Sequence, residues 1–172
     1  MLASLFLSFF LFFLRADLVA LQVESPAFGP QAEIPQKYTC DGENISPPIS
    51  WKDLPNGTKS LALISDDPDA PTIIWVHWVV YNLPETVSGL QEGTPKTETL
   101  DQGGIQGKTD FGTVGYGGPC PPAGPVHHYH FKLYALDTPL TLPPGATKAD
   151  ILMAATGHIL AQSDLVGTYK RS

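Results

Sequence analysis

The sequence is poor in basic residues. Its 172 residues include 10 Lys and Arg against 17 Asp and Glu, which gives a formal net charge of −7. A protein that tracks nucleic-acid phosphates needs a basic face, and no Lys/Arg cluster supplies one here. The composition excludes nucleic acid as a partner and disfavours a broad anionic membrane surface. A single anion in a local pocket remains compatible, because backbone N–H groups bind anions without net positive charge.

Cysteine and catalytic motifs are also scarce. Cys40 and Cys120 are the two cysteines, and the absence of a CxxC pair excludes zinc-ribbon and thioredoxin-like motifs. They either form a disulfide in an oxidising compartment or stay as buried free thiols. No G-x-S-x-G or comparable nucleophile motif is present. We therefore expect no enzyme and no cofactor; a hydrolase that uses Asp67, His77 and His127 is the least favoured alternative, with Cys120 as its candidate thiol.

Long helices are disfavoured by the turn-forming residues, 16 Gly and 17 Pro. The chain is 42% hydrophobic and 16% charged, so it can build a core. Length and composition predict one β-rich domain over residues 21–172.

The N-terminal segment, residues 1–20, differs from the rest. Its apolar run Leu2–Leu14 would make a helix of roughly 20 Å, short of the ~30 Å hydrocarbon core of a bilayer. That length is typical of a signal peptide with cleavage after Ala20, which predicts a secreted or periplasmic protein. The alternatives are an uncleaved anchor or a start upstream of the native one, the latter with a cytoplasmic protein.

Apolar runs predict strands at 22–28, 61–65, 73–83, 129–136 and 165–169. Alternation places one set of side chains from the third run on one face: Trp75, His77, Val79 and Tyr81. The same parity places His127 on the face of Tyr129 in the fourth run. Residues 84–125 read as a long irregular stretch, which is more often functional than not.

One helix is predicted near the C-terminus. Thr147 and Asp150 resemble a capping box, and the stripe Ile151, Ala155 and Ile159 follows at helical spacing. His158 falls within this expected helix and reads as structural.

A proline-flanked acidic turn is the strongest sign of a site. Asp67 and Asp69 follow a predicted strand directly, and the prolines hold the turn in place. The alternative is a purely structural turn in which the Asp side chains accept hydrogen bonds from the backbone. With His77, the Gly/Pro loop 117–122, and His127 and Tyr129, the turn would form a small anion pocket in which carboxylates keep the histidines charged. His128 and His130 lack an evident third ligand for a metal.

Several blocks of sequence together resemble one family: 38–42 (YTCDG), 44–48 (NISPP), 67–71 (DPDAP), 75–78 (WVHW), 115–122 (GYGGPCPP) and 127–129 (HHY). In this order they are similar to the phosphatidylethanolamine-binding protein family, and most to its prokaryotic YbhB/YbcL branch of Raf kinase inhibitor-like proteins. The resemblance runs from about residue 25 to residue 171.

The resemblance implies a mainly β fold, an antiparallel Greek-key β-sandwich with a few peripheral short helices. It implies a non-enzymatic pocket for phosphate-like groups or phospholipid headgroups, and regulation of a partner protein. The alternative is an interaction domain, or a protease or kinase inhibitor, whose pocket is secondary. The oligomeric state is open, a homodimer included. The implied ligand-binding residues are Asp67, Asp69, Ala70, Pro71, Trp75, His77, Gly117, Gly118, Pro121, Pro122, His127 and Tyr129.

Two positions depart from relatives of the family. His128 stands where Arg is usual, and Val76 stands where a second His is frequent. Both differences lower the positive charge near the implied pocket.

Overall fold

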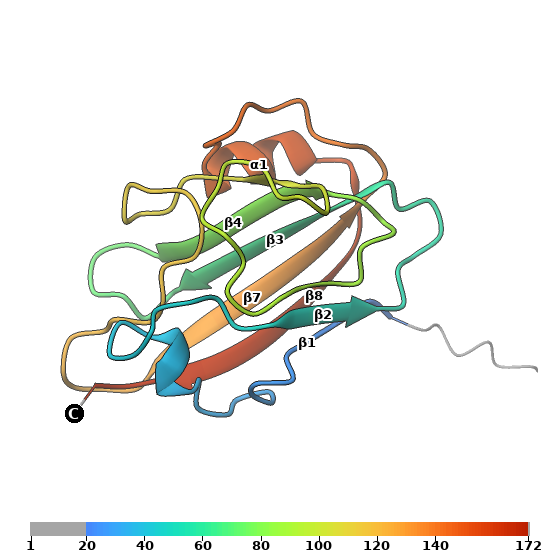
Figure 1. Ribbon diagram of the computed structural model, residues 1–172. Coiled ribbons are helices and arrows are strands. Elements are labelled where there is room, and N and C mark those ends of the chain that lie inside the picture. Colours follow the sequence, from blue (N-terminus) through green and yellow to red (C-terminus); the bar gives the residue numbers. More distant parts are fainter. Residues whose placement is uncertain (1–19, 172) are drawn as a thin grey trace, which may run out of the picture.

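Two antiparallel β-sheets make up most of the structure, a computed structural model that describes residues 20–171 (Figure 1). The larger sheet has the strand order β6-β4-β3-β7-β8 and the smaller one β1-β2-β5. The elements are β1 (Gln22–Glu24), η1 (Gln36–Tyr38), β2 (Ile49–Lys52), β3 (Ser60–Asp67), β4 (Trp75–Leu83), β5 (Gly89–Leu90), β6 (Ile105–Gln106), β7 (His127–Leu136), α1 (Lys148–Ala155) and β8 (Ile159–Tyr169). The predicted mainly β, antiparallel fold is confirmed, while the predicted leader lies, apart from Ala20, outside the described residues.

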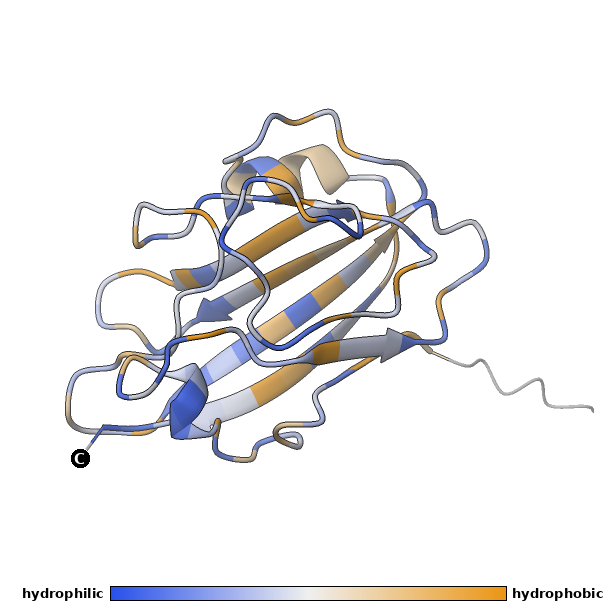
Figure 2. Cartoon of the chain, in the orientation of Figure 1, coloured by the Kyte–Doolittle hydropathy of each residue, from blue (hydrophilic) through white to orange (hydrophobic). Residues whose placement is uncertain are grey.

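Strand β3 is the centre of the larger sheet. It pairs with β4 on one side and β7 on the other, and all of its residues are buried. A strand that is covered on both faces is expected to be largely apolar, as residues 61–64 of β3 are. Here α1 covers one face of the sheet, and β1 and β2 lie over the other (Figure 1). The strands carry much of the hydrophobic colour in Figure 2.

The larger sheet therefore separates two hydrophobic cores. Between the sheets, Phe131 and Leu133 of β7 pack with Trp51 of β2. Beneath the helix, Tyr134 of β7 packs with Ile151 of α1. The predicted alternation in this strand is confirmed, since Tyr129 and Phe131 belong to the first core and Tyr134 and Leu136 to the second.

The predicted alternation in β4 is wrong because the strand carries a β-bulge. Ser65 pairs with Trp78, but the next residue, Asp66, pairs with Val76, so His77 is an extra residue on β4. A bulge reverses the parity on its two sides. His77 consequently lies on the inter-sheet face with Trp78, whereas Val79 and Tyr81 face the helix.

The C-terminal helix is shorter than predicted. Its capping box forms, with the Thr147 hydroxyl accepting from the Asp150 N–H. The helix ends at Ala155, because Gly157 adopts a left-handed φ of +82° that terminates helices. Ile159 and His158 thus lie outside the helix, and Ile159 begins β8. That strand spans 11 residues instead of the predicted five, and its alternating polar residues pair with β7 at the sheet edge.

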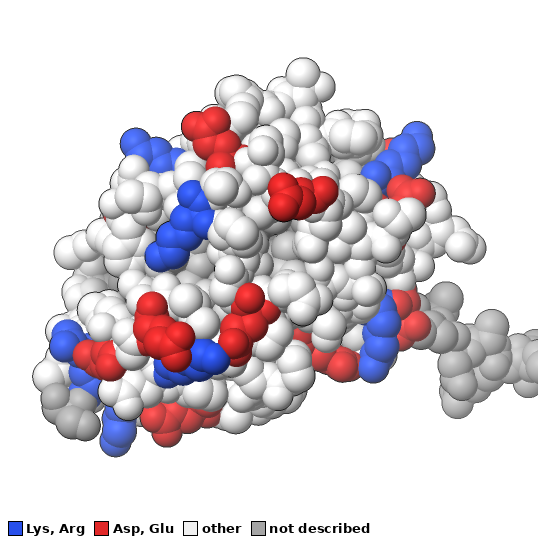
Figure 3. Space-filling view, viewed as in Figure 1, with Lys and Arg blue, Asp and Glu red and all other residues white. Residues whose placement is uncertain are grey.

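The remaining segments are short or irregular. The first strand ends at Glu24 rather than Phe28, and residues 84–125 contain the two-residue strands β5 and β6. Within residues 20–171, no helix is long and apolar enough to cross a membrane. On the face seen in Figure 3, basic side chains lie apart or beside acidic ones.

Candidate ligand pocket

A cavity of about 290 Å³ lies at the end of the larger sheet where β3 finishes and β4 and β7 begin. The turn after β3, the first residues of β4 and β7, and two loops form its walls. The lining residues are Asp67, Ala70, Pro71, Trp75, His77, Phe111, Cys120, Pro121, Pro122, His127 and Tyr129. Most residues singled out from the sequence are thus brought together around one space.

A buried ion-pairing contact joins two strands at the base of this pocket. Nδ1 of His127 lies 2.7 Å from Oδ2 of Asp67, and both side chains are about 95% buried. The other Asp67 oxygen, Oδ1, accepts from the Asp69 N–H at 2.8 Å. The proline-flanked turn therefore aims Asp67 at His127, and both carboxylate oxygens accept hydrogen bonds within the protein.

His77 is held by the loop opposite rather than by a carboxylate. Its Nδ1 lies 2.6 Å from the Gly117 carbonyl oxygen, and its ring contacts Tyr129 edge-on, with centroids 5.2 Å apart. Burial lowers the pKa of His77 below its ordinary value of 6.5, against the smaller opposing effects of Gly117 and Asp67. The expectation that carboxylates keep the histidines charged is therefore wrong for this residue, because desolvation exceeds the attraction.

The Tyr129 hydroxyl is buried, lies beside the Asp67 carboxylate and makes no hydrogen bond of ordinary length within residues 20–171. Burial raises its pKa, and the charge of Asp67 adds to the effect, so the phenol stays protonated at physiological pH. Unpartnered buried hydroxyls are uncommon in proteins. The hydroxyl is a donor and acceptor that a ligand in the pocket can satisfy.

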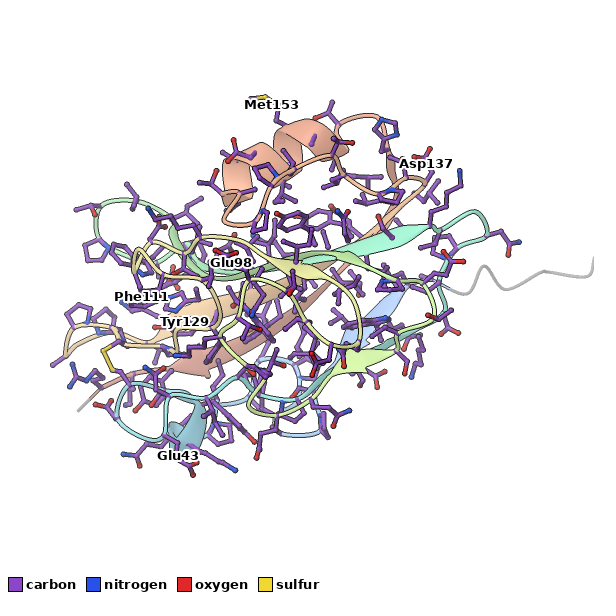
Figure 4. The ribbon with its side chains drawn as sticks, turned by 45° about the horizontal axis from the view of Figure 1, so that its top comes forward. Glu43, Glu98, Phe111, Tyr129, Asp137 and Met153 are labelled. Carbon is purple, nitrogen blue, oxygen red and sulfur yellow. A yellow bond between two sulfur atoms is a disulfide. The ribbon has the colours of Figure 1, made fainter. Side chains whose placement is uncertain are left out.

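Phe111 forms a wall that sequence reasoning missed. Its side chain is 43% exposed, and its ring contacts Trp75 at 5.6 Å and His77 at 5.4 Å between centroids. Figure 4 shows Phe111 and Tyr129 at the same end of the molecule. The available signal was an apolar aromatic residue, Phe111, within the Gly-rich stretch 110–118. Cys120, which was not among the residues predicted to bind a ligand, is also a lining residue.

Three predicted residues do not line the cavity. Asp69 lies at the rim, where its Oδ2 pairs with Nδ1 of the half-exposed His128 at 2.7 Å. Gly117 supplies the carbonyl for His77, and Gly118 donates its N–H to Asn44 at 2.7 Å. A Cβ on Gly118 would lie 2.2 Å from a backbone oxygen, so the loop packs this closely only with glycine.

Comparison with known proteins identifies the family. The profile described as "Phosphatidylethanolamine-binding protein" matches residues 24–170. The chain belongs to the phosphatidylethanolamine-binding protein family. The resemblance inferred from the sequence blocks is therefore confirmed.

Curated relatives in this family extend over nearly the whole chain. A "UPF0098 protein" of Methanothermobacter thermautotrophicus is 54% identical over 151 residues, 88% of this chain and 99% of the relative. Another, from Aquifex aeolicus, is 50% identical and covers 99% of both chains.

Solved structures of the family have the same fold. A Chlamydia trachomatis homologue described as a putative phosphatidylethanolamine-binding protein has a TM-score of 0.82 at 43% identity, covering 90% of this chain and 99% of the other. Escherichia coli YbcL, described as a member of the mammalian family, has a TM-score of 0.83 at 34% identity, covering 88% and 99%.

In this family member the two cysteines form a disulfide, which decides between the alternatives left open by the sequence. The bond joins Cys40, just after η1, to Cys120 in the pocket loop. The Cys40 N–H also donates to the Pro119 carbonyl at 3.0 Å, and the Tyr116 hydroxyl donates to the Tyr38 carbonyl at 2.9 Å. The pocket loop is therefore fixed to the η1 segment by covalent and hydrogen bonds.

The histidines outside the pocket pair with carboxylates. Nδ1 of His130 lies 2.6 Å from Asp164, and His158 lies 2.8 Å from Asp137. Within the described part of the chain, no group of three or more His, Cys, Asp or Glu is arranged to hold a metal ion.

Proposed function

We propose that this chain is a non-enzymatic binding protein whose pocket takes one small anionic group, either a phosphate-like ion or the headgroup of a phospholipid. The observation that carries the proposal is the convergence of His77, His127 and the unpartnered Tyr129 hydroxyl on one cavity. Trp75 and Phe111 give that cavity apolar walls. Concave, mostly apolar sites with a few convergent polar groups are typical of small-molecule binding.

The size of the cavity supports a headgroup rather than a whole lipid. Its volume of about 290 Å³ lies at the low end of small-molecule sites. The family description names phosphatidylethanolamine, whose phosphate and amine are polar groups of suitable size.

The chemistry of the site favours binding over hydrolysis. The candidate thiol, Cys120, is consumed in a disulfide and has no free thiolate to act as a nucleophile. Nδ1 of His77 is engaged with the Gly117 carbonyl oxygen. Asp67 and His127 pair with each other, and no Ser, Thr or Lys is found among the described residues that line their cavity.

The proposal is tested by nuclear magnetic resonance with inorganic phosphate and phosphoethanolamine as probes. The ring signals of His77, His127 and Tyr129 should shift on titration, whereas those of His158, which lies outside the pocket, should not. Spectra that stay unchanged at high millimolar probe concentrations would refute the pocket.

A protein partner is the second candidate, favoured by exposed apolar side chains near the pocket. Ile73 and Ile74 are each about half exposed and line a neighbouring groove that also includes Asp110 and Gly112, on either side of Phe111. A regulated partner would cover these side chains. Cross-linking from Ile74 in the native host, with and without phosphate, distinguishes a partner that senses the ligand from one that does not.

We also propose that the protein works outside the cytoplasm. The disulfide supports this, since such bonds persist mainly in oxidising compartments. Mass spectrometry of the protein from its native source should find an N-terminus near Leu21. An intact Met1 in the mature protein would contradict export by a cleaved signal peptide.

A further inference from the structure

We propose that the Cys40–Cys120 disulfide is a redox control of the ligand pocket. Formation of the bond fixes one wall of the cavity for binding, reduction loosens that wall, and a bound ligand protects the bond in return. The inference rests on the proposed function and deepens it, because it names the condition under which the pocket takes its anion.

The disulfide belongs to the pocket itself. Cys120 lines the cavity directly before Pro121 and Pro122, which form the same wall. Figure 4 shows the bond at the end of the molecule where Phe111 lies. Cys120 is exposed and Cys40 is half-buried, so a reductant in solution can reach the bond. Exposed disulfides are more often labile or regulatory, whereas structural disulfides resist reduction.

Few other bonds hold this part of the wall. Proline has no backbone N–H, so Pro121 and Pro122 donate no hydrogen bond that could fix them. Within residues 20–171, the stretch 120–126 makes one further backbone connection, a bridge between Ala123 and Arg171. The disulfide is therefore the main attachment of the wall beside the cavity.

The segments on either side of the bond have hydrogen bonds of their own. In the loop before Cys120, the Gly118 N–H donates to the Asn44 side chain at 2.7 Å. On the η1 side, the Ile34 N–H donates to the Thr168 carbonyl of β8 at 2.8 Å. Loss of the disulfide should therefore free mainly the wall after the loop glycines, while the sheet and the rest of the loop stay in place.

The reduction step is an exchange with a dithiol. A thiolate of the reductant attacks Sγ of Cys120, the more exposed residue of the pair, and the S–S bond breaks. Cys40 leaves as a thiolate and takes up a proton. The second thiolate of the reductant then displaces Cys120 from the mixed disulfide, and Cys120 also takes up a proton. Two electrons and two protons pass to the protein, and the dithiol becomes a cyclic disulfide.

Linkage between reduction and binding gives the expected magnitude. A loosened wall must be ordered again when a ligand binds, so the reduced protein should bind about tenfold more weakly. Coupling between two equilibria is reciprocal, so saturating ligand should make the bond about tenfold harder to reduce. For a two-electron couple, this factor corresponds to about 30 mV in reduction potential.

The first experiment compares the affinity of the protein for inorganic phosphate in its two redox states. Calorimetry should give a Kd about tenfold higher for protein reduced with dithiothreitol than for the oxidised form. A double variant, Cys40→Ser with Cys120→Ser, should bind as the reduced form does, whether or not dithiothreitol is present. The matched control is Asp66→Asn, which breaks a charge cluster on the helix side and should keep both the affinity and the redox effect of the wild type.

The second experiment measures protection of the bond by the ligand. The oxidised protein is equilibrated in mixtures of reduced and oxidised dithiothreitol, with phosphate or with chloride at equal ionic strength, and free thiols are alkylated and counted by mass spectrometry. Saturating phosphate should raise the ratio of reduced to oxidised dithiothreitol at the midpoint by about tenfold. Hydrogen exchange of the reduced protein should stay slow in β3 and β7.

The outcomes separate this inference from the proposed function. Equal affinities of the two redox forms, or a midpoint that phosphate does not move, would overturn the redox control and leave the anion pocket standing. No binding of phosphate or phosphoethanolamine by the oxidised protein would overturn the proposed function itself. Loss of slow exchange in β3 and β7 on reduction would also overturn the inference, because the bond would then hold the whole domain rather than one wall of the pocket.

Discussion

Asp66 and Asp67 are neighbours in β3, yet they lie on opposite faces of the larger sheet and have opposite surroundings. Asp66 is fully buried beneath α1 and is bound by two lysines, with Lys148 at 2.5 Å and Lys132 at 2.9 and 3.1 Å. Asp67 faces the cavity and pairs with His127. Permanent cations neutralise the first carboxylate, whereas a titratable ring partners the second. The difference separates a structural charge cluster from the proposed ligand site.

The helix side and the pocket side of the larger sheet are also held to their neighbouring segments by different kinds of bond. On the helix side, Lys148 ties the first turn of α1 to the sheet through Asp66. On the pocket side, the Cys40–Cys120 disulfide ties the loop to the η1 segment.

The largest effect on stability is expected from removing the disulfide on the pocket side, with Cys40→Ser and Cys120→Ser combined. The bond spans a sequence separation of 80 residues, and loop-closure entropy for such a span predicts a loss of about 4 kcal/mol in the free energy of unfolding. Urea denaturation of the double variant checks this value. A loss below about 1 kcal/mol would show that the hydrogen bonds of the loop suffice.

The next effect is expected from Asp66→Asn on the helix side. Two lysines would lose their buried counter-charge, which costs about 3 kcal/mol when a buried pair is broken. Chemical denaturation should show this loss, and phosphate binding should stay unchanged. The control is Asp137→Asn, which breaks an exposed pair with His158 and should change stability by less than about 0.5 kcal/mol.

Asp67→Asn should lower the free energy of unfolding by only about 1 kcal/mol, but it should change the hydrogen bond that His127 offers to a ligand. The asparagine oxygen would keep accepting from the Asp69 N–H, so its NH₂ group would face His127 and donate to Nδ1. The ring would then carry its proton on Nε2 and could donate it to an anion in the cavity. Nitrogen-15 spectra of the imidazole report the tautomer, and calorimetry with inorganic phosphate reports the change in affinity. A tautomer that stays on Nδ1 would contradict this reasoning.

The smallest effect concerns the pH dependence of the ligand-free protein. The pKa of His77 is lowered in the folded state from its ordinary 6.5, so the unfolded chain binds the extra proton first as the pH falls. The contribution of His77 to the free energy of unfolding is therefore fully present above about pH 6.5 and is lost as the pH falls toward the lower folded-state pKa. The difference in stability between wild type and His77→Gln, measured from about pH 7 to 5, isolates this contribution. A difference that does not vary with pH would contradict it.

Strand β7 and the proline turn after β3 were predictable because their signals are local. Alternation places Tyr129 and His127 on one face, and the prolines fix Asp67. The bulge at His77 was not predictable, because it depends on how β3 pairs with β4 and leaves no mark in the hydrophobic pattern. The end of the helix at Gly157 had a local signal that the apolar stripe outweighed.

Contacts between distant segments decided the rest of the site. Phe111 reaches the cavity only because its loop folds beside β4, with the Asp110 N–H donating to the Val76 carbonyl and the Asp110 carboxylate accepting from the Val76 N–H. Asp66 was overlooked since its two lysines lie 66 and 82 residues away. The sequence blocks nonetheless indicated the family, because several appear in order along nearly the whole domain.

The bulge in β4 divides the strand into two parts whose side chains can be substituted independently. From Trp78 to Leu83 the apolar side chains belong to the two cores, whereas Trp75 and His77 line the cavity. Without the bulge, regular alternation back from Trp78 would place His77 on the helix side of the sheet and Val76 on the cavity side. The bulge therefore separates the residues of β4 that line the pocket from those that form the cores. Substitutions in the pocket part should be tolerated without repacking of the cores.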